Sequence, residues 1–269
     1  MLEVLSDRLG RRPSSPFFAR LASAQPKKRY LIATSARSGS TFLCSRIADY
    51  GDLGFPMEFL NESYISEFDR LFPHPNLADY ERYITGSFAS RQGIFGIKTD
   101  WWRFQEARAL GLFESLLDPI DLIVHLRRED FVAQAVSLTL AIESNVWHER
   151  DVNTAGIDPW HQDVAYAPEK VKVQARNILN QEYYWRRFIA EAQAPAIDLT
   201  YEHVAQDVDG AIRNLANAFD LRLAARPARS DAIQQTRSGI GQQWCDRFRE
   251  DCEDFVEFWT EYRGLITAA

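Results

Sequence analysis

One stretch of this chain, YLIATSARSGSTFLCSRIADYG at residues 30–51, constrains the fold more than any other. It opens with an apolar run and turns polar between Ser35 and Thr41, where seven residues hold an arginine, a glycine and four hydroxyl groups. Apolar residues then return at helical spacing. This order predicts a strand over residues 29–34, a tight polar turn, and a helix that ends near residue 50.

Three more apolar runs predict strands, and they alternate with segments of helical periodicity. The second of these runs is continuously apolar almost to its end, as expected of a strand buried on both faces. These strands are predicted at residues 93–100, 120–128 and 195–204. Helices are predicted at 65–91 (interrupted by Pro73 and Pro75), 129–147, 168–192, 208–219 and 241–263. The alternation predicts an α/β fold with a central parallel sheet covered by helices on both faces.

Two segments predict long loops. Gly51, Gly54 and Pro56 break the helical periodicity, so residues 51–64 are expected to form a loop that returns toward the sheet. Residues 148–167 are predicted to form a second loop, of a length that is typical of lids and binding segments.

The chain is predicted to fold as one domain behind a short arm. Residues 1–28 are mixed in composition and contain three prolines, which predicts an N-terminal arm with one short helix. Residues 29–269 contain no internal repeat or low-complexity tract. With 269 residues, of which 46% are hydrophobic, the chain is long enough for one large core.

Charge and cysteine content exclude several classes of protein. The net charge of -7 argues against a surface that binds nucleic acid, so a polyanion would need a local basic pocket. The three cysteines form no CxxC pair, so neither a zinc site nor a redox motif is predicted, and the pattern suits a reducing cytoplasm.

No apolar run approaches the roughly 20 residues that a membrane span needs, and no signal peptide is predicted.

The polar turn after the first strand has the composition of an anion site. In a parallel α/β fold, ligands bind at the carboxyl ends of the strands, beside the free N–H groups of the following helix. Gly39 allows close approach of the backbone, Ser38, Ser40 and Thr41 add hydroxyl donors, and Arg37 adds a planar cation. The expected ligand is a phosphate or a similar oxyanion. The simpler interpretation is an ordinary turn in which one serine or threonine caps the helix.

The turn differs from the nucleotide-binding motif GxxxxGK[ST]. Thr34 stands where that motif has its first glycine, and no lysine lies in the loop. Magnesium-dependent hydrolysis of a nucleoside triphosphate is therefore disfavoured. A P-loop-type nucleotide or small-molecule kinase stays open as an alternative, as does a nucleotide-binding module without catalytic activity.

The turn resembles the 5′-phosphosulfate loop of sulfotransferases that use 3′-phosphoadenosine 5′-phosphosulfate (PAPS), and is closest to the bacterial trehalose 2-sulfotransferase type. Other stretches are similar to that family in the same order. They are GFPMEF at 54–59, FGIKTDW at 95–101, HLRREDFVAQAVS at 125–137, NVWHERD at 145–151 and LTYEHV at 199–204. The resemblance covers roughly residues 29–260. It implies a three-layer, P-loop-like fold, a homodimer, and metal-free transfer of a sulfonate group from PAPS to a hydroxyl of a small-molecule, carbohydrate or glycolipid acceptor.

The resemblance also implies roles for single residues. Glu58, in the GFPMEF stretch, falls on the family's catalytic glutamate and is expected to act as the general base, with Glu62 as the rival carboxylate. Arg37 is expected to bind the 5′-phosphate and the bridging oxygen, together with the rest of its loop. Lys98, at the end of a predicted strand, is expected to assist from the other side.

A second group of residues is expected to hold the rest of the donor. Arg128 and Ser137 are predicted to bind the 3′-phosphate, although the adjacent Arg127 is an alternative. Tyr201 is predicted on the adenosine side, and Arg237 is predicted to close over the donor from the C-terminal region.

The acceptor side departs from the trehalose type. Ala36 stands where that type has a glutamine, and Phe55 where it has a glutamate, so two polar partners of a sugar are missing. Trehalose is therefore disfavoured as the acceptor. Phe55, Trp101 and Trp147 are predicted to line an aromatic acceptor pocket, with packing in the core as the alternative for the tryptophans.

Overall fold

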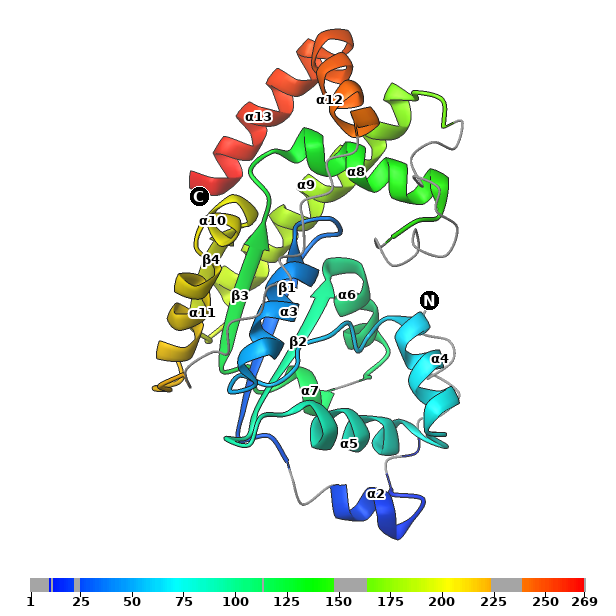
Figure 1. Cartoon of the computed structure of the whole chain (residues 1–269), viewed down its shortest axis with the longest axis vertical. Coiled ribbons are helices and arrows are strands. Elements are labelled where there is room, and N and C mark those ends of the chain that lie inside the picture. Colours follow the sequence, from blue (N-terminus) through cyan, green and yellow to red (C-terminus); the bar gives the residue numbers. More distant parts are fainter. Residues whose placement is uncertain are drawn as a thin grey trace.

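A computed structural model of the chain describes residues 10, 12–21, 25–112, 114–147, 164–223 and 239–268. Its centre is a four-stranded sheet with the strand order β2-β1-β3-β4, in which every neighbouring pair is parallel (Figure 1). The strands are β1 (Lys28–Thr34), β2 (Ile94–Asp100), β3 (Leu122–Arg127) and β4 (Ala196–Thr200). Their carboxyl ends meet at one edge of the sheet, as the predicted α/β fold requires.

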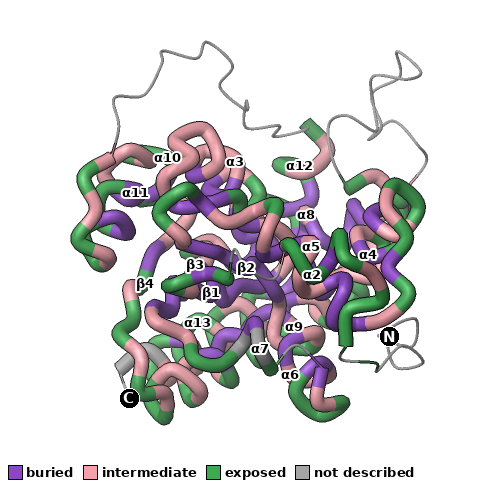
Figure 2. Tube along the Cα trace, turned by 90° about the horizontal axis from the view of Figure 1, so that it is seen from below, coloured by how far each residue is buried: buried purple, intermediate pink, exposed green. Residues whose placement is uncertain are grey.

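Helices cover both faces of the sheet and form three layers, with the buried strands in the middle (Figure 2). Because side chains of a strand alternate between faces, Tyr30 and Ile32 of β1 pack toward α3 (Ser40–Tyr50) and α11 (Val208–Asn217). Leu31 and Ala33 pack on the opposite face. The helices on that face include α4 (Glu62–Leu71), α5 (Leu77–Phe88), α6 (Trp101–Ala109) and α9 (Pro168–Glu191). The predicted α/β fold class is therefore confirmed.

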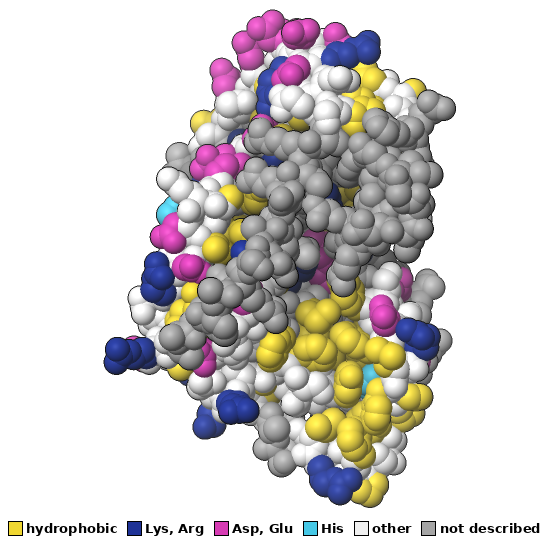
Figure 3. Space-filling model, in the orientation of Figure 1, with side chains coloured by type: hydrophobic (Ala, Val, Ile, Leu, Met, Phe, Trp, Pro, Cys, Tyr) yellow, Lys and Arg dark blue, Asp and Glu magenta, His cyan; other side chains and the backbone are white. Residues whose placement is uncertain are grey.

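A third apolar cluster lies beyond the carboxyl ends of the strands. It joins α8 (Phe131–Ser144), α9, α12 (Gly239–Asp251) and α13 (Glu253–Ala268). Acidic side chains gather at the tip formed by α12 and α13 (Figure 3), where Glu250, Asp251, Glu253 and Asp254 are exposed. Part of the negative net charge is thus carried by the outer surface of these two helices.

Two predicted elements differ from the structure at the end of the sheet. The strand predicted over 195–204 stops at Thr200, and α10 (Tyr201–Gln206) begins there because the Thr200 hydroxyl accepts a hydrogen bond from the N–H of His203. Helix α6 was not predicted. It begins directly after β2 because the Asp100 carboxylate caps it, accepting from the N–H groups of Trp102 and Arg103.

Other boundaries follow the predictions more closely. The predicted interruption at Pro73 and Pro75 separates α4 from α5, and Asn76 caps the second of these helices by accepting from the N–H of Asp79. The helix predicted over 241–263 covers the right part of the chain, but a turn at Cys252 divides it into α12 and α13.

The predicted N-terminal arm carries the expected short helix, α2 (Pro16–Leu21). Another short helix, α7 (Glu114–Leu117), lies between α6 and β3. Phe18 of α2 is buried against Phe72 and His74. The backbone N–H of Ser14 donates to both oxygens of Asp79 on α5. The division into an arm over 1–28 and one domain over 29–269 stays a prediction.

No helix in the described part of the chain is long and apolar enough to cross a membrane.

Candidate functional site

The loop between β1 and α3 has an unusual backbone at two positions. Arg37 (φ 62°) and Gly39 (φ 82°) both adopt left-handed conformations. Gly39 is also the N-cap of α3, and no side chain caps this helix. A Cβ atom at residue 39 would lie 2.2 Å from the ring of Tyr201, which therefore packs directly over the glycine. Only glycine meets both demands.

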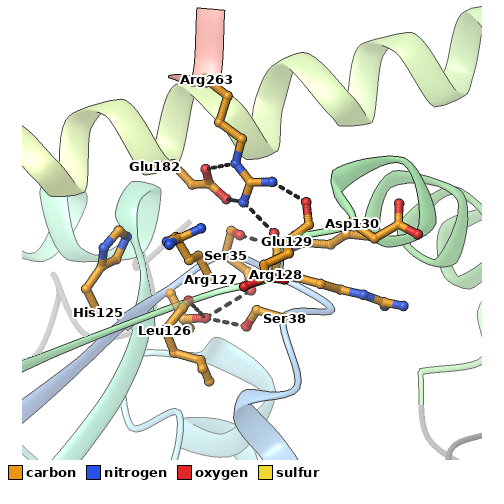
Figure 4. A network of polar contacts seen from close by, with 12 residues as sticks. Ser35, Ser38, His125, Leu126, Arg127, Arg128, Glu129, Asp130, Glu182 and Arg263 are labelled. Carbon is orange, nitrogen blue, oxygen red and sulfur yellow. Dashed lines mark hydrogen bonds and ion pairs between the residues drawn. The ribbon is translucent and has the colours of Figure 1, made fainter. Parts of the chain in front are cut away.

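The loop hydroxyls are used to hold the loop in place. Ser38 is fully buried, and its hydroxyl makes a short contact with the Thr34 hydroxyl, which also donates to the carbonyl of Leu126 at 3.0 Å (Figure 4). The interpretation of this turn as a simple helix cap is therefore wrong, because the N-cap is Gly39 and not a serine or threonine.

Gln134 on α8 is a second anchor of the loop, and it was not singled out from the sequence. Its side-chain N–H group donates to the Ser35 hydroxyl at 2.9 Å and to the carbonyl of Ala36 at 2.7 Å. It is fully buried on an otherwise apolar helix face. A lone amide among apolar positions was the signal that could have revealed it, because such a group needs a hydrogen-bond partner.

Two arginines beside this loop are near enough for their charges to interact. Arg37 donates from Nε to the Ser137 hydroxyl at 3.0 Å, and from its terminal nitrogen to the carbonyl of Trp147 at 2.7 Å. Burial lowers the pKa of Arg37, and the positive charge of Arg128 lowers it further. No carboxylate in the described part of the chain pairs with Arg37. A cation without a carboxylate partner, beside a second cation, is suited to an anion.

The neighbours Arg127 and Arg128 have different partners. Arg127 donates from Nε to Asp198 at 3.3 Å, and the same carboxylate pairs with Nδ1 of His125 at 3.0 Å. Arg128 instead lies 5.2 Å from the centre of the Tyr201 ring, and its Nε is 4.0 Å from a carboxylate oxygen of Glu202. Figure 4 shows the two side chains extending in opposite directions. Of the two, Arg128 is the one directed toward the loop after β1.

The predicted loop at 51–64 does return to the sheet. Met57 forms an isolated parallel bridge with Ile97, and the N–H of Lys98 donates to the carbonyl of Met57 at 3.0 Å. This contact brings Glu58 beside Lys98, with Oε1 of Glu58 2.7 Å from Nζ of Lys98. The same ammonium donates to the Thr41 hydroxyl at 3.2 Å. Lys98 thus connects Glu58 to the loop after β1.

The charge states of this pair are fixed by their contacts. Burial alone would raise the pKa of Glu58, but the charge and hydrogen bond of Lys98 and the hydrogen bond from Asn61 outweigh it, so the pKa lies below its usual value of 4.5. For Lys98, which is 5% exposed, burial alone would lower the pKa, but the charge of Glu58 outweighs it and the pKa is raised. Glu58 is therefore ionised and able to accept a proton.

Asn61 was also not singled out from the sequence. Its amide donates to the second carboxylate oxygen of Glu58 at 2.7 Å, while its carbonyl oxygen accepts from the N–H of Ser63 and caps α4. One asparagine therefore fixes both the start of a helix and the orientation of Glu58. Glu62, the rival carboxylate, is the first residue of α4.

The three aromatic residues predicted at the acceptor lie in different surroundings. Phe55 and Trp147 are 40% and 39% exposed. Trp101 stacks on Tyr184, with ring centres 5.5 Å apart, and packs edge-on against Trp185. Trp101 therefore packs, partly buried, among the aromatic side chains between α6 and α9. Arg237 lies outside the described residues.

Known proteins resemble this chain over most of its length. A parallel sheet in which β1 leads through a tight, left-handed loop into α3 defines a P-loop-like α/β protein. A model of the Stf0 sulphotransferase family matches residues 29–101 and 105–251. The chain therefore belongs to the Stf0 sulphotransferase family, and it is a sulfotransferase.

Two curated relatives are named trehalose 2-sulfotransferase. The one from Mycolicibacterium smegmatis is 25% identical over 263 residues, which cover 83% of this chain and 95% of the relative. The one from Mycobacterium tuberculosis is 25% identical over 262 residues, which cover 82% and 94%. A crystal structure of a sulfotransferase from Alicyclobacillus acidocaldarius aligns with a TM-score of 0.40 and 15% identity, over 87% of this chain and 96% of the other.

Proposed function

We propose that this enzyme transfers a sulfonate group from PAPS to a hydroxyl group of a small-molecule, carbohydrate or glycolipid acceptor, with Glu58 as the general base. The observation that carries the proposal is the double contact of Lys98, which pairs with Glu58 and donates to Thr41 of the anion loop. A base and an anion site joined by one side chain are the two parts that such a transfer needs in close proximity.

In the proposed reaction the acceptor oxygen attacks the sulfur of PAPS. The new oxygen–sulfur bond forms as the bond from sulfur to the 5′-phosphate oxygen breaks, and Glu58 takes the hydroxyl proton. The departing phosphate oxygen gains negative charge, and Arg37 is suited to stabilise that charge because it is a half-buried cation without an acidic partner in the described part of the chain. Adenosine 3′,5′-bisphosphate is the second product.

The residues around the loop fit a donor with two phosphate groups. The left-handed backbone at Arg37 and Gly39, with the uncapped start of α3, suits the 5′-phosphate. Arg128 and Ser137 are proposed to hold the 3′-phosphate. Ser137 already accepts a hydrogen bond from Arg37, so the two proposed phosphate sites adjoin. Tyr201, over Gly39 and beside Arg128, is proposed to contact the adenosine.

The acceptor is proposed to differ from trehalose. The names of the curated relatives suggest a sugar, but Ala36 and Phe55 offer no polar group where the trehalose type has two. Ala36 packs against the apolar cluster that joins α8, α9 and α12, and Phe55 presents an exposed aromatic ring. A homodimer and a cytoplasmic location stay predictions.

The proposal is tested with PAPS carrying labelled sulfate and a panel of hydroxylated acceptors, including trehalose, other sugars, glycolipids and aromatic alcohols. We expect label to appear on at least one acceptor. Glu58→Gln should lower kcat by roughly 10²- to 10⁴-fold, the usual contribution of a general base. Its affinity for adenosine 3′,5′-bisphosphate, measured by calorimetry, should stay near that of the wild type.

Glu62→Gln is the matched control, because it makes the same change four residues away. It should retain turnover. If the two variants lose activity equally, or if Glu58→Gln retains it, Glu58 is not the base. If adenosine 3′,5′-bisphosphate does not bind the wild type, the donor assignment is wrong.

A further inference from the structure

The C-terminal helix reaches the end of β3 through one buried arginine. Arg263 of α13 is 8% exposed, and it pairs with Glu182 of α9, which is 2% exposed. The pair is bidentate, with Nε and one terminal nitrogen 2.9 and 2.8 Å from the two carboxylate oxygens. The two partners lie 81 residues apart in sequence.

The same guanidinium also holds the main chain after β3. It donates to the carbonyl oxygens of Arg128 and Glu129 (Figure 4). A buried ion pair is costly unless its remaining hydrogen-bonding groups are satisfied. Here those remaining N–H groups satisfy two backbone carbonyls at the position where the chain leaves the sheet. Arginine suits this role because its planar fork can serve four acceptors, whereas an ammonium cannot.

The segment 128–130 is held from its N–H side as well. The Glu202 carboxylate accepts from the N–H groups of Glu129 at 2.9 Å and Asp130 at 3.5 Å. The Asp130 carboxylate caps α8 and pairs with Arg249 of α12 at 2.8 Å. Side chains of α10, α12 and α13 therefore all hold this segment of three residues, and α9 contributes through Glu182, which holds Arg263.

This degree of restraint exceeds what a helix start requires, since Asp130 alone supplies the cap. The Arg128 side chain has few restraints of its own: a ring contact with Tyr201 and a carboxylate 4.0 Å away. Its direction therefore depends on the backbone from which it departs, and that backbone is oriented by the carbonyl contacts of Arg263.

We propose that Arg263, held by Glu182, is a positioning residue that aims Arg128 at the 3′-phosphate of the donor. This inference rests on the proposed function, because it takes the 3′-phosphate as the ligand of Arg128. It predicts that a substitution of Arg263, 135 residues from Arg128 in sequence, removes the contribution of the 3′-phosphate to donor binding and leaves the contribution of the 5′-phosphate in place.

The test compares two probes that differ only in that phosphate, adenosine 3′,5′-bisphosphate and adenosine 5′-monophosphate. The ratio of their dissociation constants measures how much the 3′-phosphate contributes. For the wild type we expect a ratio of roughly 10 to 100, as for one charge-assisted contact. In Arg263→Lys and in Arg128→Ala the ratio should fall toward 1. In the double variant it should fall no further, because both changes act on one contact.

A control separates positioning from loss of stability. Trp244→Phe alters a buried side chain of α12, in the apolar cluster that α12 shares with α8, α9 and α13, so it should lower the melting temperature and leave the ratio unchanged. Glu182→Gln is the second variant, for use if Arg263→Lys does not fold. It should lower the ratio because it replaces the bidentate ion pair that holds Arg263 with a weaker, neutral hydrogen bond.

The outcomes distinguish this inference from the proposed function. If the wild-type ratio is near 1, the donor assignment fails and the inference fails with it. If the wild type and Trp244→Phe keep a high ratio, Arg128→Ala loses it, and a folded Arg263→Lys or Glu182→Gln retains it, the donor assignment stands and the positioning role is wrong.

Discussion

The proposed donor side of the site and its proposed acceptor side are built in opposite ways. The donor side, formed by the loop after β1 and the segment after β3, consists mostly of buried or half-buried polar groups whose partners come from distant parts of the chain. Ser35, for example, bonds to Gln134, and Arg37 to Ser137. The acceptor side offers Phe55 and Trp147, each about two-fifths exposed. A change on the donor side disturbs several elements, whereas a change on the acceptor side disturbs little else.

This difference explains how a family can keep one donor and change its acceptor. Substituting an exposed aromatic residue leaves no buried polar group unpaired, so it costs little stability. Substituting a buried polar group leaves its partner unsatisfied. Family membership therefore supports the donor more strongly than the acceptor. The following predictions can break or sharpen this contrast, and they run from the largest expected effect to the smallest.

Among the predictions for this contrast, Arg37→Ala should have the largest effect. It removes the cation proposed to stabilise the departing phosphate, and losing one such group typically costs roughly 10²- to 10³-fold in kcat. Steady-state kinetics with PAPS and the best acceptor of the panel provide the measurement. Arg37→Lys should recover part of the loss because it restores the charge without the fork. Wild-type turnover in Arg37→Ala would refute the assignment.

Arg128→Ala should weaken the binding of adenosine 3′,5′-bisphosphate by roughly 10- to 100-fold, as expected for a charge-assisted contact. Arg127→Ala is the matched control. That side chain pairs with Asp198 and not with the loop, so we expect less than about a threefold change in affinity, a shift that surface ion pairs commonly give. Calorimetric titration checks both. The reverse pattern would show that Arg127 is the phosphate ligand.

Phe55→Ala should raise KM for the best acceptor by up to about tenfold, because the acceptor loses the binding free energy of one aromatic contact. The affinity for adenosine 3′,5′-bisphosphate should not change, because Phe55 belongs to the acceptor side. If donor affinity falls by as much as acceptor KM rises, the two sides are not separate in the way described above.

Gly39→Ala should destabilise the protein more than Gly51→Ala does. Both glycines have positive φ angles, 82° and 74°, so both alanines carry backbone strain of about 1 kcal/mol. At residue 39 the new Cβ would also meet the Tyr201 ring, whereas nothing lies within 4 Å at residue 51. The added clash should cost about 1 to 3 kcal/mol more, seen as a further fall of several degrees in melting temperature. Equal falls would show that the Tyr201 ring moves aside freely.

The free energy of unfolding should depend on pH through the ion pair between Glu58 and Lys98. The pKa of Glu58 is lowered in the folded state, so its contribution to the free energy of unfolding is present above pH 4.5 and is lost as the pH falls through the folded pKa. The pKa of Lys98 is raised, so its contribution is present below pH 10.5 and is lost as the pH rises through the folded pKa. Urea unfolding of wild type and Glu58→Gln should differ by a constant amount from pH 6 to 8. A difference that grows on acidification would contradict the sign.

Sequence alone predicted the elements whose cause is local. The four strands follow from apolar runs, and α9 follows from a proline at its first turn and helical spacing. Helix α10 was missed because LTYEHV alternates like a strand, and only the Thr200 side chain shows where the strand ends. Helix α6 was not predicted because Asp100 both ends β2 and caps the next helix, and the apolar run before it indicates only the first of these roles.

The candidate site divides in the same way. Seven consecutive residues make up the loop after β1, so the sequence by itself determined a polar turn at this place and the side chains that the turn offers to a proposed anion. Tertiary structure decided which of two adjacent arginines faces that loop and that Glu58 pairs with Lys98. It also decided that Arg263 supports the segment beyond β3. Those facts depend on strand register and on contacts between residues tens of positions apart, and a pattern of neighbours along the chain carries no information about either.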